Sequence, residues 1–113
     1  MSLITNSPLR TLIVNGDQEK INGDAQRTGL NLRDHDLRNL DLRGVNLRHA
    51  DLRGAYLRAA DLRGVDLSAA KLDGASLHGA KVSGVLFPRD LAADEIRLSI
   101  EFGTRMRSTL PER

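Results

Sequence analysis

A leucine recurs at every fifth position through the middle of this chain. The series is Leu32, Leu37, Leu42, Leu47, Leu52, Leu57, Leu62, Leu67, Leu72 and Leu77, and Val82 and Phe87 continue it in phase. The residue two positions before each of these is mostly small and apolar, as at Ala50, Ala60 and Val65. An α-helix needs apolar residues about every 3.6 positions and a half-buried strand needs them at every second position, so neither explains this period.

Each unit of the repeat predicts a short extended segment followed by a corner. In an extended segment the leucine and the residue two before it point to one side, while the polar residue between them points to the other. The two residues after the leucine then form the corner, where Gly44, Gly54 and Gly64 supply backbone that suits a turn. Each unit is therefore expected to be one wall of a closed coil, with leucine inside.

The number of walls in one coil follows from a longer repeat. The segment 41–47, Asp-Leu-Arg-Gly-Val-Asn-Leu, returns as Asp-Leu-Arg-Gly-Val-Asp-Leu at 61–67, twenty residues later. The inward valines Val45, Val65 and Val85 share this spacing. Four units of five residues make up that distance. The pattern predicts a coil with a square cross-section.

These units resemble the pentapeptide-repeat family, whose motif is close to Ala-Asp/Asn-Leu-X-X. The motif stands here as Ala-Asp-Leu-Arg-Gly at both 50–54 and 60–64, and the resemblance covers about half of the chain. It implies an all-β solenoid, a right-handed quadrilateral β-helix with a central leucine ladder. Residues 30–87 would then form about three coils.

The segments on either side are expected to cap the solenoid, because its end coils would expose apolar side chains and open strand edges. In the N-terminal cap, residues 1–29, we expect a disordered start, a short strand at 12–14, and turns at 15–17 and 22–24. In the C-terminal cap, residues 88–113, Pro88 ends the repeat and Asp90 is expected to N-cap a helix that ends at Gly103. Residues 105–113 would be a flexible basic tail.

Length and composition describe one small domain. The chain has 113 residues, a net charge of +2 and no cysteine, which excludes a disulfide framework and thiolate metal sites. No apolar run is long enough for a signal peptide or a membrane span. We therefore expect a cytoplasmic protein.

No arrangement typical of an active site stands out. The glycines recur with the corners and do not form a phosphate-binding loop, and no histidines have the spacing of metal ligands. We predict no enzyme activity, no catalytic or cofactor-binding residues, and no metal or cofactor. His35 falls on an inward position, and we expect the N-terminal cap to satisfy it, whereas His49 and His78 fall on outer corners.

Arginines follow the leucines in the first part of the repeat. They are Arg33, Arg38, Arg43, Arg48, Arg53, Arg58 and Arg63. Their spacing places them around the coil and not along one stripe. An aspartate or asparagine precedes most of the leucines, so Asp41 would lie beside Arg43 and Asp61 beside Arg63. The arginines are interpreted as a mixed-charge, solubilising surface, with a functional role left open.

One wall differs from the others. Its outward residues are Asp36, Tyr56 and Ser76, and Tyr56 is the only tyrosine of the chain. An exposed aromatic residue framed by arginines is typical of an interaction hot spot and is also a weak nucleic-acid signal. We take Tyr56, Arg38, Arg58 and His78 as the candidate interaction face.

Several functions are compatible with this pattern. We expect a non-enzymatic module that presents a rigid surface to an unknown protein partner. A basic protein associated with nucleic acid is the alternative, favoured by the high isoelectric point and disfavoured by the lack of a continuous basic stripe. The family resemblance also implies a DNA mimic that binds DNA gyrase, as fluoroquinolone-resistance proteins do, but the mixed, slightly basic charge disfavours mimicry. It further suggests a homodimer, formed through the C-terminal helix or by stacking; no membrane partner is expected.

Overall fold

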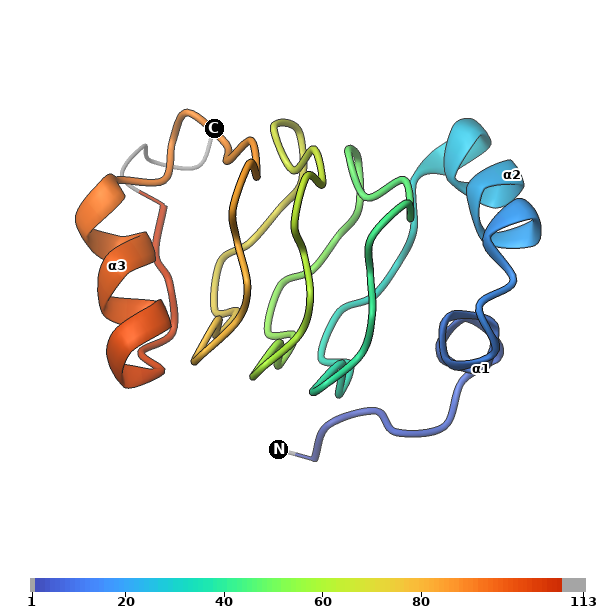
Figure 1. Ribbon diagram of the computed structural model, residues 1–113, viewed down its shortest axis with the longest axis horizontal. Coiled ribbons are helices and arrows are strands. Elements are labelled where there is room, and N and C mark those ends of the chain that lie inside the picture. Colours follow the sequence, from blue (N-terminus) through green and yellow to red (C-terminus); the bar gives the residue numbers. More distant parts are fainter. Residues whose placement is uncertain (1, 109–113) are drawn as a thin grey trace.

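The computed structural model describes residues 2–108, without the side chains of residues 24–28. Its helices are α1 (Pro8–Asn15), α2 (Gln18–Thr28) and α3 (Ala93–Phe102). Between α2 and α3 the chain winds into a stack of loops, with α1 and α2 at one end of the stack and α3 at the other (Figure 1).

Parallel β-bridges hold neighbouring loops together. Along the stack they join residues twenty apart: Asn31–Asp51–Lys71, Asp36–Tyr56–Ser76, Asp41–Asp61–Lys81 and Asp66–Leu86. The hydrogen bonds alternate in direction, since Lys71 N–H donates to Ala50 O at 3.0 Å and Leu52 N–H donates to Lys71 O at 2.8 Å. Each bridge is isolated, and the described residues contain no longer strand.

The corners between walls use left-handed backbone. Gly54 has a φ of 72°, and a Cβ at that position would overlap Asp34 Oδ1 of the loop below. Three corner residues other than glycine also have positive φ: Asp34 at 57°, Asn39 at 62° and Ala59 at 58°. This conformation disfavours side chains with a Cβ, and the effect is larger for alanine than for asparagine or aspartate.

The core is a column of leucines inside the loops. Leu32 to Leu77 of the five-residue series are 0–4% exposed. Val82 and Phe87, which continue the series in the sequence, are only partly buried. The inward positions two residues before the leucines hold mostly small side chains, and Ala55, Ala60 and Ala75 there are fully buried.

The N-terminal cap is helical, so the predicted strand at 12–14 is wrong. Ser7 caps α1 by accepting a hydrogen bond from Arg10 N–H at 3.1 Å, Pro8 occupies the first turn, and left-handed Gly16 ends the helix. These end signals outweigh the strand preference of Leu12, Ile13 and Val14. The predicted turn at 22–24 is also wrong, since these residues lie inside α2, which the fully buried Ile21 anchors to the core.

The start of the N-terminal cap was expected to be disordered, and within the described residues Ile4 contradicts this. Ile4 forms a parallel bridge with His35, with hydrogen bonds from Ile4 N–H to Asp34 O at 2.7 Å and from Asp36 N–H to Ile4 O at 2.8 Å. The N-terminal segment therefore extends one wall of the stack by one parallel pairing, and this backbone pairing fixes the path of the segment.

Side chains of α2 form hydrogen bonds with the backbone of the first loop at residues 43–46, at the same end of the stack. Asn22 accepts a hydrogen bond from Asn46 N–H at 2.8 Å and donates one to Gly44 O at 3.0 Å. Gln18 donates to Arg43 O at 2.6 Å. These amides take the place of backbone groups that a preceding loop would supply.

The C-terminal cap begins later than predicted. The N-cap of α3 is Ala92, without a side-chain hydrogen bond, and left-handed Gly103 ends the helix. Asp90 accepts a hydrogen bond from Ser108 Oγ at 2.9 Å and does not cap α3, which corrects that prediction. The expected flexible tail also needs correction at 105–108, because Met106 is fully buried and pairs with Gly74 and Ala75; residues 109–113 lie outside the described part.

Candidate interaction face

The wall of Asp36, Tyr56 and Ser76 is covered at both ends and open in the middle. Parallel bridges stack the three residues in one column. Asp36 is 6% exposed beside the N-terminal segment, and Ser76 is 1% exposed and donates to Gly103 O at 3.0 Å. Tyr56, between them, is half-buried. The two caps therefore cover Asp36 and Ser76, and of this column only Tyr56 stays partly accessible to a partner.

Arg38 links two members of this face. Its guanidinium donates to both carboxylate oxygens of Asp36, from Nε at 2.9 Å and from Nη2 at 2.8 Å. The same guanidinium lies over the ring of Tyr56, with Cζ 5.4 Å from the ring centroid. The bidentate ion pair restricts the rotamers of Arg38, and the cation–π contact then orients the ring of Tyr56.

Asp36 and Arg38 stabilise each other in their ionised forms. The hydrogen bond from the Arg38 side chain lowers the pKa of Asp36, and burial opposes that shift only in part. The hydrogen bond that Arg38 donates to the Asp36 carboxylate in turn raises the pKa of Arg38. The pair therefore stays ionised at neutral pH, and the arginine remains a cation over the tyrosine ring.

The other two predicted members lie differently. The Arg58 side chain is exposed, and within the described residues it has no recorded hydrogen bond or ion pair. His78 is partly buried, and Gly103 of the C-terminal segment lies against it. The packing is close, since a Cβ added to Gly103 would lie 3.2 Å from His78 Cβ and 3.3 Å from the imidazole ring. The structure thus brings Arg38 onto Tyr56, leaves Arg58 free to meet a partner, and turns His78 toward the cap.

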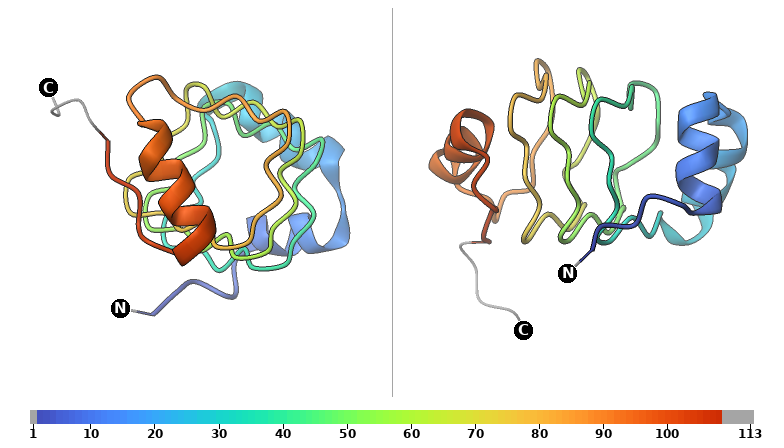
Figure 2. Two further views of the ribbon diagram at one scale, coloured as in Figure 1. Left: turned by 60° about the vertical axis from the view of Figure 1, so that its left-hand side comes forward. Right: turned by 90° about the horizontal axis from the view of Figure 1, so that it is seen from below.

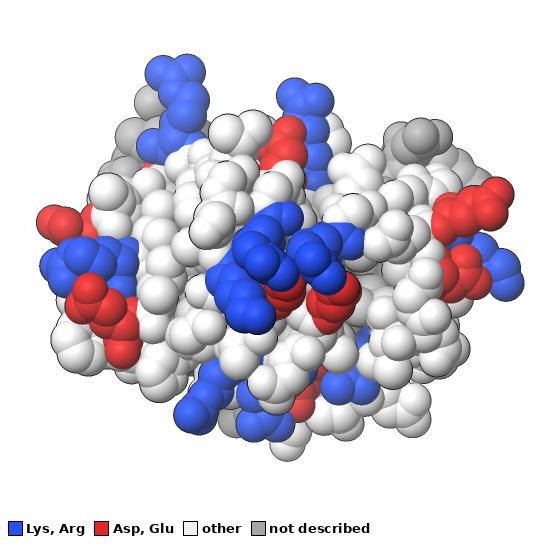
Figure 3. All heavy atoms as spheres, in the orientation of Figure 1, with Lys and Arg blue, Asp and Glu red and all other residues white. Residues whose placement is uncertain are grey.

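Three further arginines of the repeat pair with the aspartate two residues before them. Arg43 holds Asp41, Arg53 holds Asp51 and Arg63 holds Asp61, each through Nε and Nη2 at 2.7–3.0 Å. In each pair the aspartate also accepts the arginine backbone N–H. Figure 3 shows basic and acidic side chains side by side in the middle of one face. The predicted mixed-charge pairing is confirmed, and the backbone bond to the same carboxylate was not foreseen.

Pairs on neighbouring loops are connected. Arg43 Nε lies 3.2 Å from Asp61 Oδ2, one loop farther along the stack. Hydrogen bonding from Arg63, with added attraction from Arg43, lowers the pKa of Asp61 to about 2. Such a network fixes the long arginine side chains and reduces the cost of ordering them at a binding surface.

His35 has the role predicted from its inward position. It is buried, and its Nδ1 lies 2.9 Å from Arg33 O while Nε2 lies 2.8 Å from Ser7 Oγ. Since a carbonyl only accepts, Nδ1 carries the proton and Nε2 accepts the Ser7 hydroxyl. The ring therefore joins the first loop to the N-cap of α1. Among the described residues, no group of three or more histidine, cysteine or acidic side chains is placed to hold a metal ion.

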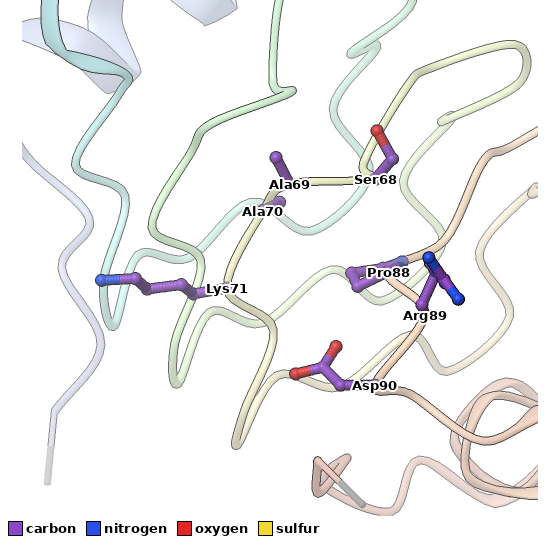
Figure 4. A pocket seen from close by; sticks show the side chains of 7 residues that line it. All are labelled: Ser68, Ala69, Ala70, Lys71, Pro88, Arg89 and Asp90. Atoms are coloured by element: carbon purple, nitrogen blue, oxygen red, sulfur yellow. The ribbon is translucent and has the colours of Figure 1, made fainter. Parts of the chain in front are cut away.

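A shallow groove of ≈ 600 Å³ lies where the last loop leaves the stack (Figure 4). It is lined by Ser68, Ala69, Ala70, Lys71, Pro88, Arg89 and Asp90. Lys71 extends away from the other lining side chains (Figure 4). The lining residues do not form a nucleophile with an adjacent general base, so the groove does not suggest an active site. In the described part of the chain, no helix has both the length and the apolar character to cross a bilayer.

Comparison with known families agrees with the repeat. The model for pentapeptide repeats matches residues 28–58 and 50–87, with eight copies of the repeat. The chain belongs to the pentapeptide repeat family. This confirms the resemblance seen in the sequence, and right-handed β-helices are the fold for which the family is known. No curated protein matches the chain.

Two solved structures are similar to this pentapeptide repeat protein. One is the pentapeptide repeat protein Rfr23 from the cyanobacterium Cyanothece 51142, with 35% identity and a TM-score of 0.38; the match covers 50% of this chain and 43% of Rfr23. This chain thus spans less than half the length of that relative. The other is a pentapeptide repeat protein from the Arabidopsis thaliana thylakoid lumen, with 21% identity, a TM-score of 0.28, and coverage of 73% of this chain and 82% of that one.

Proposed function

We propose that this pentapeptide repeat protein is a non-enzymatic protein-interaction module. The observation that carries the proposal is the half-buried Tyr56 ring, held under the Arg38 guanidinium at 5.4 Å with the exposed Arg58 two residues farther on. Tyrosine and arginine are enriched among the residues that dominate protein–protein binding, and a fixed tyrosine loses little entropy on binding.

The proposed scaffold is a right-handed quadrilateral β-helix of about three coils. The twenty-residue offset of the bridges and the column of buried leucines support this assignment. A stack that is held by backbone hydrogen bonds on each wall is stiff. It would therefore present Tyr56, Arg38 and Arg58 to a partner with little rearrangement.

The charge pattern favours a protein partner over nucleic acid. Arg38, Arg43, Arg53 and Arg63 already hold aspartates through two hydrogen bonds each. Paired arginines contribute less to a phosphate-binding surface, which needs unmatched positive charge along a groove or stripe. The same arginines also oppose mimicry of an anionic duplex.

The test is a pull-down from host lysate with the purified full chain, with and without nuclease. The variant Tyr56→Ala/Arg58→Glu alters the centre of the face, and Asn46→Ala/Arg48→Glu makes the matching change at the same positions of another repeat unit. We expect a specific protein to be retained after nuclease, lost with the first variant and kept with the second.

Two outcomes would contradict the proposal. Material that disappears with nuclease would favour the nucleic-acid alternative, and salt titration would then show the steep loss of affinity that phosphate contacts produce. Equal retention by wild type and Tyr56→Ala/Arg58→Glu would remove the Tyr56 wall as the binding face.

A further inference from the structure

Arg58 lacks the carboxylate that its position in the repeat usually has. Elsewhere an arginine after a leucine pairs with the aspartate two residues before it, as Arg63 does with Asp61 at 2.7 Å. Where an asparagine replaces that aspartate, the guanidinium can lie near a carboxylate of the next loop instead, as Arg48 lies 3.8 Å from Asp66. The repeat thus offers an arginine two places where it can meet an acidic side chain.

For Arg58 both of these places hold an uncharged residue. Tyr56 stands two residues before it, and Ser76 occupies the corresponding position one loop farther along the stack. The Arg58 side chain is exposed, and within the part of the chain that the structure describes it has no recorded hydrogen bond or ion pair. An exposed guanidinium without an acceptor is suited to bind an anionic group.

The hydroxyl of Tyr56 is a second unpartnered donor. No hydrogen bond of this hydroxyl is recorded among the described residues, and every buried polar side-chain atom there has a partner, so the hydroxyl lies at the surface. The half-buried ring is held under the guanidinium of Arg38, which Asp36 already occupies with two hydrogen bonds. The face therefore combines a fixed ring, a free hydroxyl and the guanidinium of Arg58, which no carboxylate neutralises.

The two terminal segments leave this level of the wall open. Toward one end of the stack Asp36 N–H donates to Ile4 O, and toward the other Ser76 donates to Gly103 O. Figure 2 shows the segment before α1 and the segment after α3 toward opposite ends of the stack. The open strip between them contains Tyr56 and follows the direction of the chain in the wall.

A hollow of ≈ 280 Å³ lies at one edge of this strip, and Arg58 lies at the other. The hollow is lined by residues of both terminal segments and of the corner before Tyr56, namely Ser2, Leu3, Asp34, Gly54 and Arg105. Gly54 and Arg58 are four residues apart in the chain. This separation is at most about 14 Å, which an extended segment of about five residues spans. Asp34 and Arg105 bring one charge of each sign to the hollow, so Arg58 sets the sign of the face.

We propose that the Tyr56 face recognises an extended segment of a protein partner that carries an acidic side chain, with the carboxylate on Arg58 and apolar atoms against the Tyr56 ring. This inference rests on the proposed function and adds the chemistry of the partner to it. A carboxylate matches the planar fork of an arginine with two parallel hydrogen bonds. A nucleic acid would need unmatched positive charge along several phosphates, and this level of the wall offers one unmatched guanidinium.

The test selects binders from a library of short random peptides with the purified full chain. We expect wild-type binders to be enriched in aspartate and glutamate, and exchange of the acidic residue for its amide to weaken the best binder by at least about tenfold. Arg58→Gln should lose this preference, and Arg58→Glu should select lysine and arginine instead. Arg89→Gln removes an exposed arginine outside the face and should keep the wild-type preference.

A second variant separates binding from folding. Tyr56→Asp restores an aspartate two residues before Arg58, the arrangement that Asp61 and Arg63 already have. We expect the new aspartate to occupy Arg58 and abolish the preference for acidic peptides. The melting temperature should stay close to the wild-type value, because the bridged pair Asp41 and Asp61 shows that the stack accepts two aspartates in one column.

Several results would overturn the inference. They are no acidic enrichment with wild type, acidic enrichment that survives Arg58→Gln, equal loss with Arg89→Gln, and displacement of the peptide by a duplex oligonucleotide with the steep salt dependence of phosphate contacts. The lysate pull-down keeps the two proposals apart. A host protein that is lost with Tyr56→Ala/Arg58→Glu but kept with Arg58→Gln and with Tyr56→Asp would overturn the acidic segment and leave the interaction module in place.

Discussion

The hydroxyl of Ser99 accepts a hydrogen bond from the backbone N–H of Leu77 at 2.9 Å. Both residues are fully buried, and Leu77 belongs to the last loop of the stack. In inner loops the equivalent N–H groups donate to the next loop, as Leu57 N–H does to Ser76 O at 2.8 Å. Ser99 therefore supplies the acceptor that a backbone carbonyl of the next loop would supply if the repeat continued. Both this hydrogen bond and the apolar side chains of α3 hold the helix against the stack.

Replacing Ser99 should destabilise the fold more than its small size suggests. Ser99→Ala leaves the buried N–H of Leu77 without an acceptor, and an unsatisfied buried donor costs about 1–3 kcal/mol. We expect the free energy of unfolding, measured by urea denaturation, to fall by that amount. Ser83→Ala, at an exposed position of the same loop, should change it by less than about 0.5 kcal/mol. Equal effects at the two sites would show that the hydrogen bond is not important.

Ala59 offers an opportunity for stabilisation. Its φ of 58° is left-handed, which costs a residue with a Cβ roughly 1–2 kcal/mol, whereas glycine adopts it freely. Glycine also makes the unfolded chain more flexible, at a cost of about 0.4–1 kcal/mol. We therefore expect Ala59→Gly to raise the free energy of unfolding by about 0.5–1 kcal/mol, as measured by thermal and urea denaturation.

The matched control for Ala59 is Ala69, at the same corner position two units later. Ala69 is exposed like Ala59 but is not among the residues with positive φ. Ala69→Gly should therefore destabilise, since only the entropy of the unfolded chain changes. Effects of the same sign at both positions would argue against backbone strain at Ala59.

The aspartate–arginine pairs make stability depend on pH in the acid range. Asp61 has a pKa of about 2 in the folded chain, below its ordinary value of 3.8, chiefly because Arg63 donates hydrogen bonds to it. A lowered pKa contributes stability that is fully present above about pH 4 and is lost as the pH falls toward 2. Asp36, Asp41 and Asp51 are shifted in the same direction.

We expect the melting temperature to fall between pH 4 and pH 2, and Asp61→Asn to make that fall shallower. The comparison is Asp17→Asn, an exchange of the same kind outside the arginine pairs. Melting curves recorded across this range at constant ionic strength would check the prediction. A variant whose slope matches wild type would show that Asp61 is equally protonated in the folded and unfolded chain.

The regular part of the structure could be predicted because its signal repeats. Each leucine from Leu32 to Leu77 occurs in the same local pattern, and one inward leucine in every five residues permits few backbone paths. The link between Asp41 and Arg43 was also visible, since alternate residues of an extended segment lie on one side. The caps have no such redundancy. At 12–14 a single β-rich triplet competed with the helix signals of Ser7, Pro8 and Gly16, and the helix signals prevailed.

The candidate face was predicted only in part for a related reason. The order of residues gives the column of Asp36, Tyr56 and Ser76, but not the burial of its two ends. Ser76 is covered by Gly103, twenty-seven residues away in the chain, and Asp36 lies beside Arg10 and the N-terminal segment. Contacts of this length are not encoded by any local pattern.

The sequence by itself therefore determined the period, the inward and outward sides of each unit, and the family. These follow from local backbone geometry and from the burial of one leucine per unit. Only the tertiary structure decided how the stack ends: Asn22 and Ser99 supply hydrogen-bonding groups that missing loops would have given, while Val82, Gly84 and Phe87 receive none from the described residues. The reason is that an end has no repeat to define it, so the free energy of its unpaired backbone is settled by whichever distant side chains can reach it.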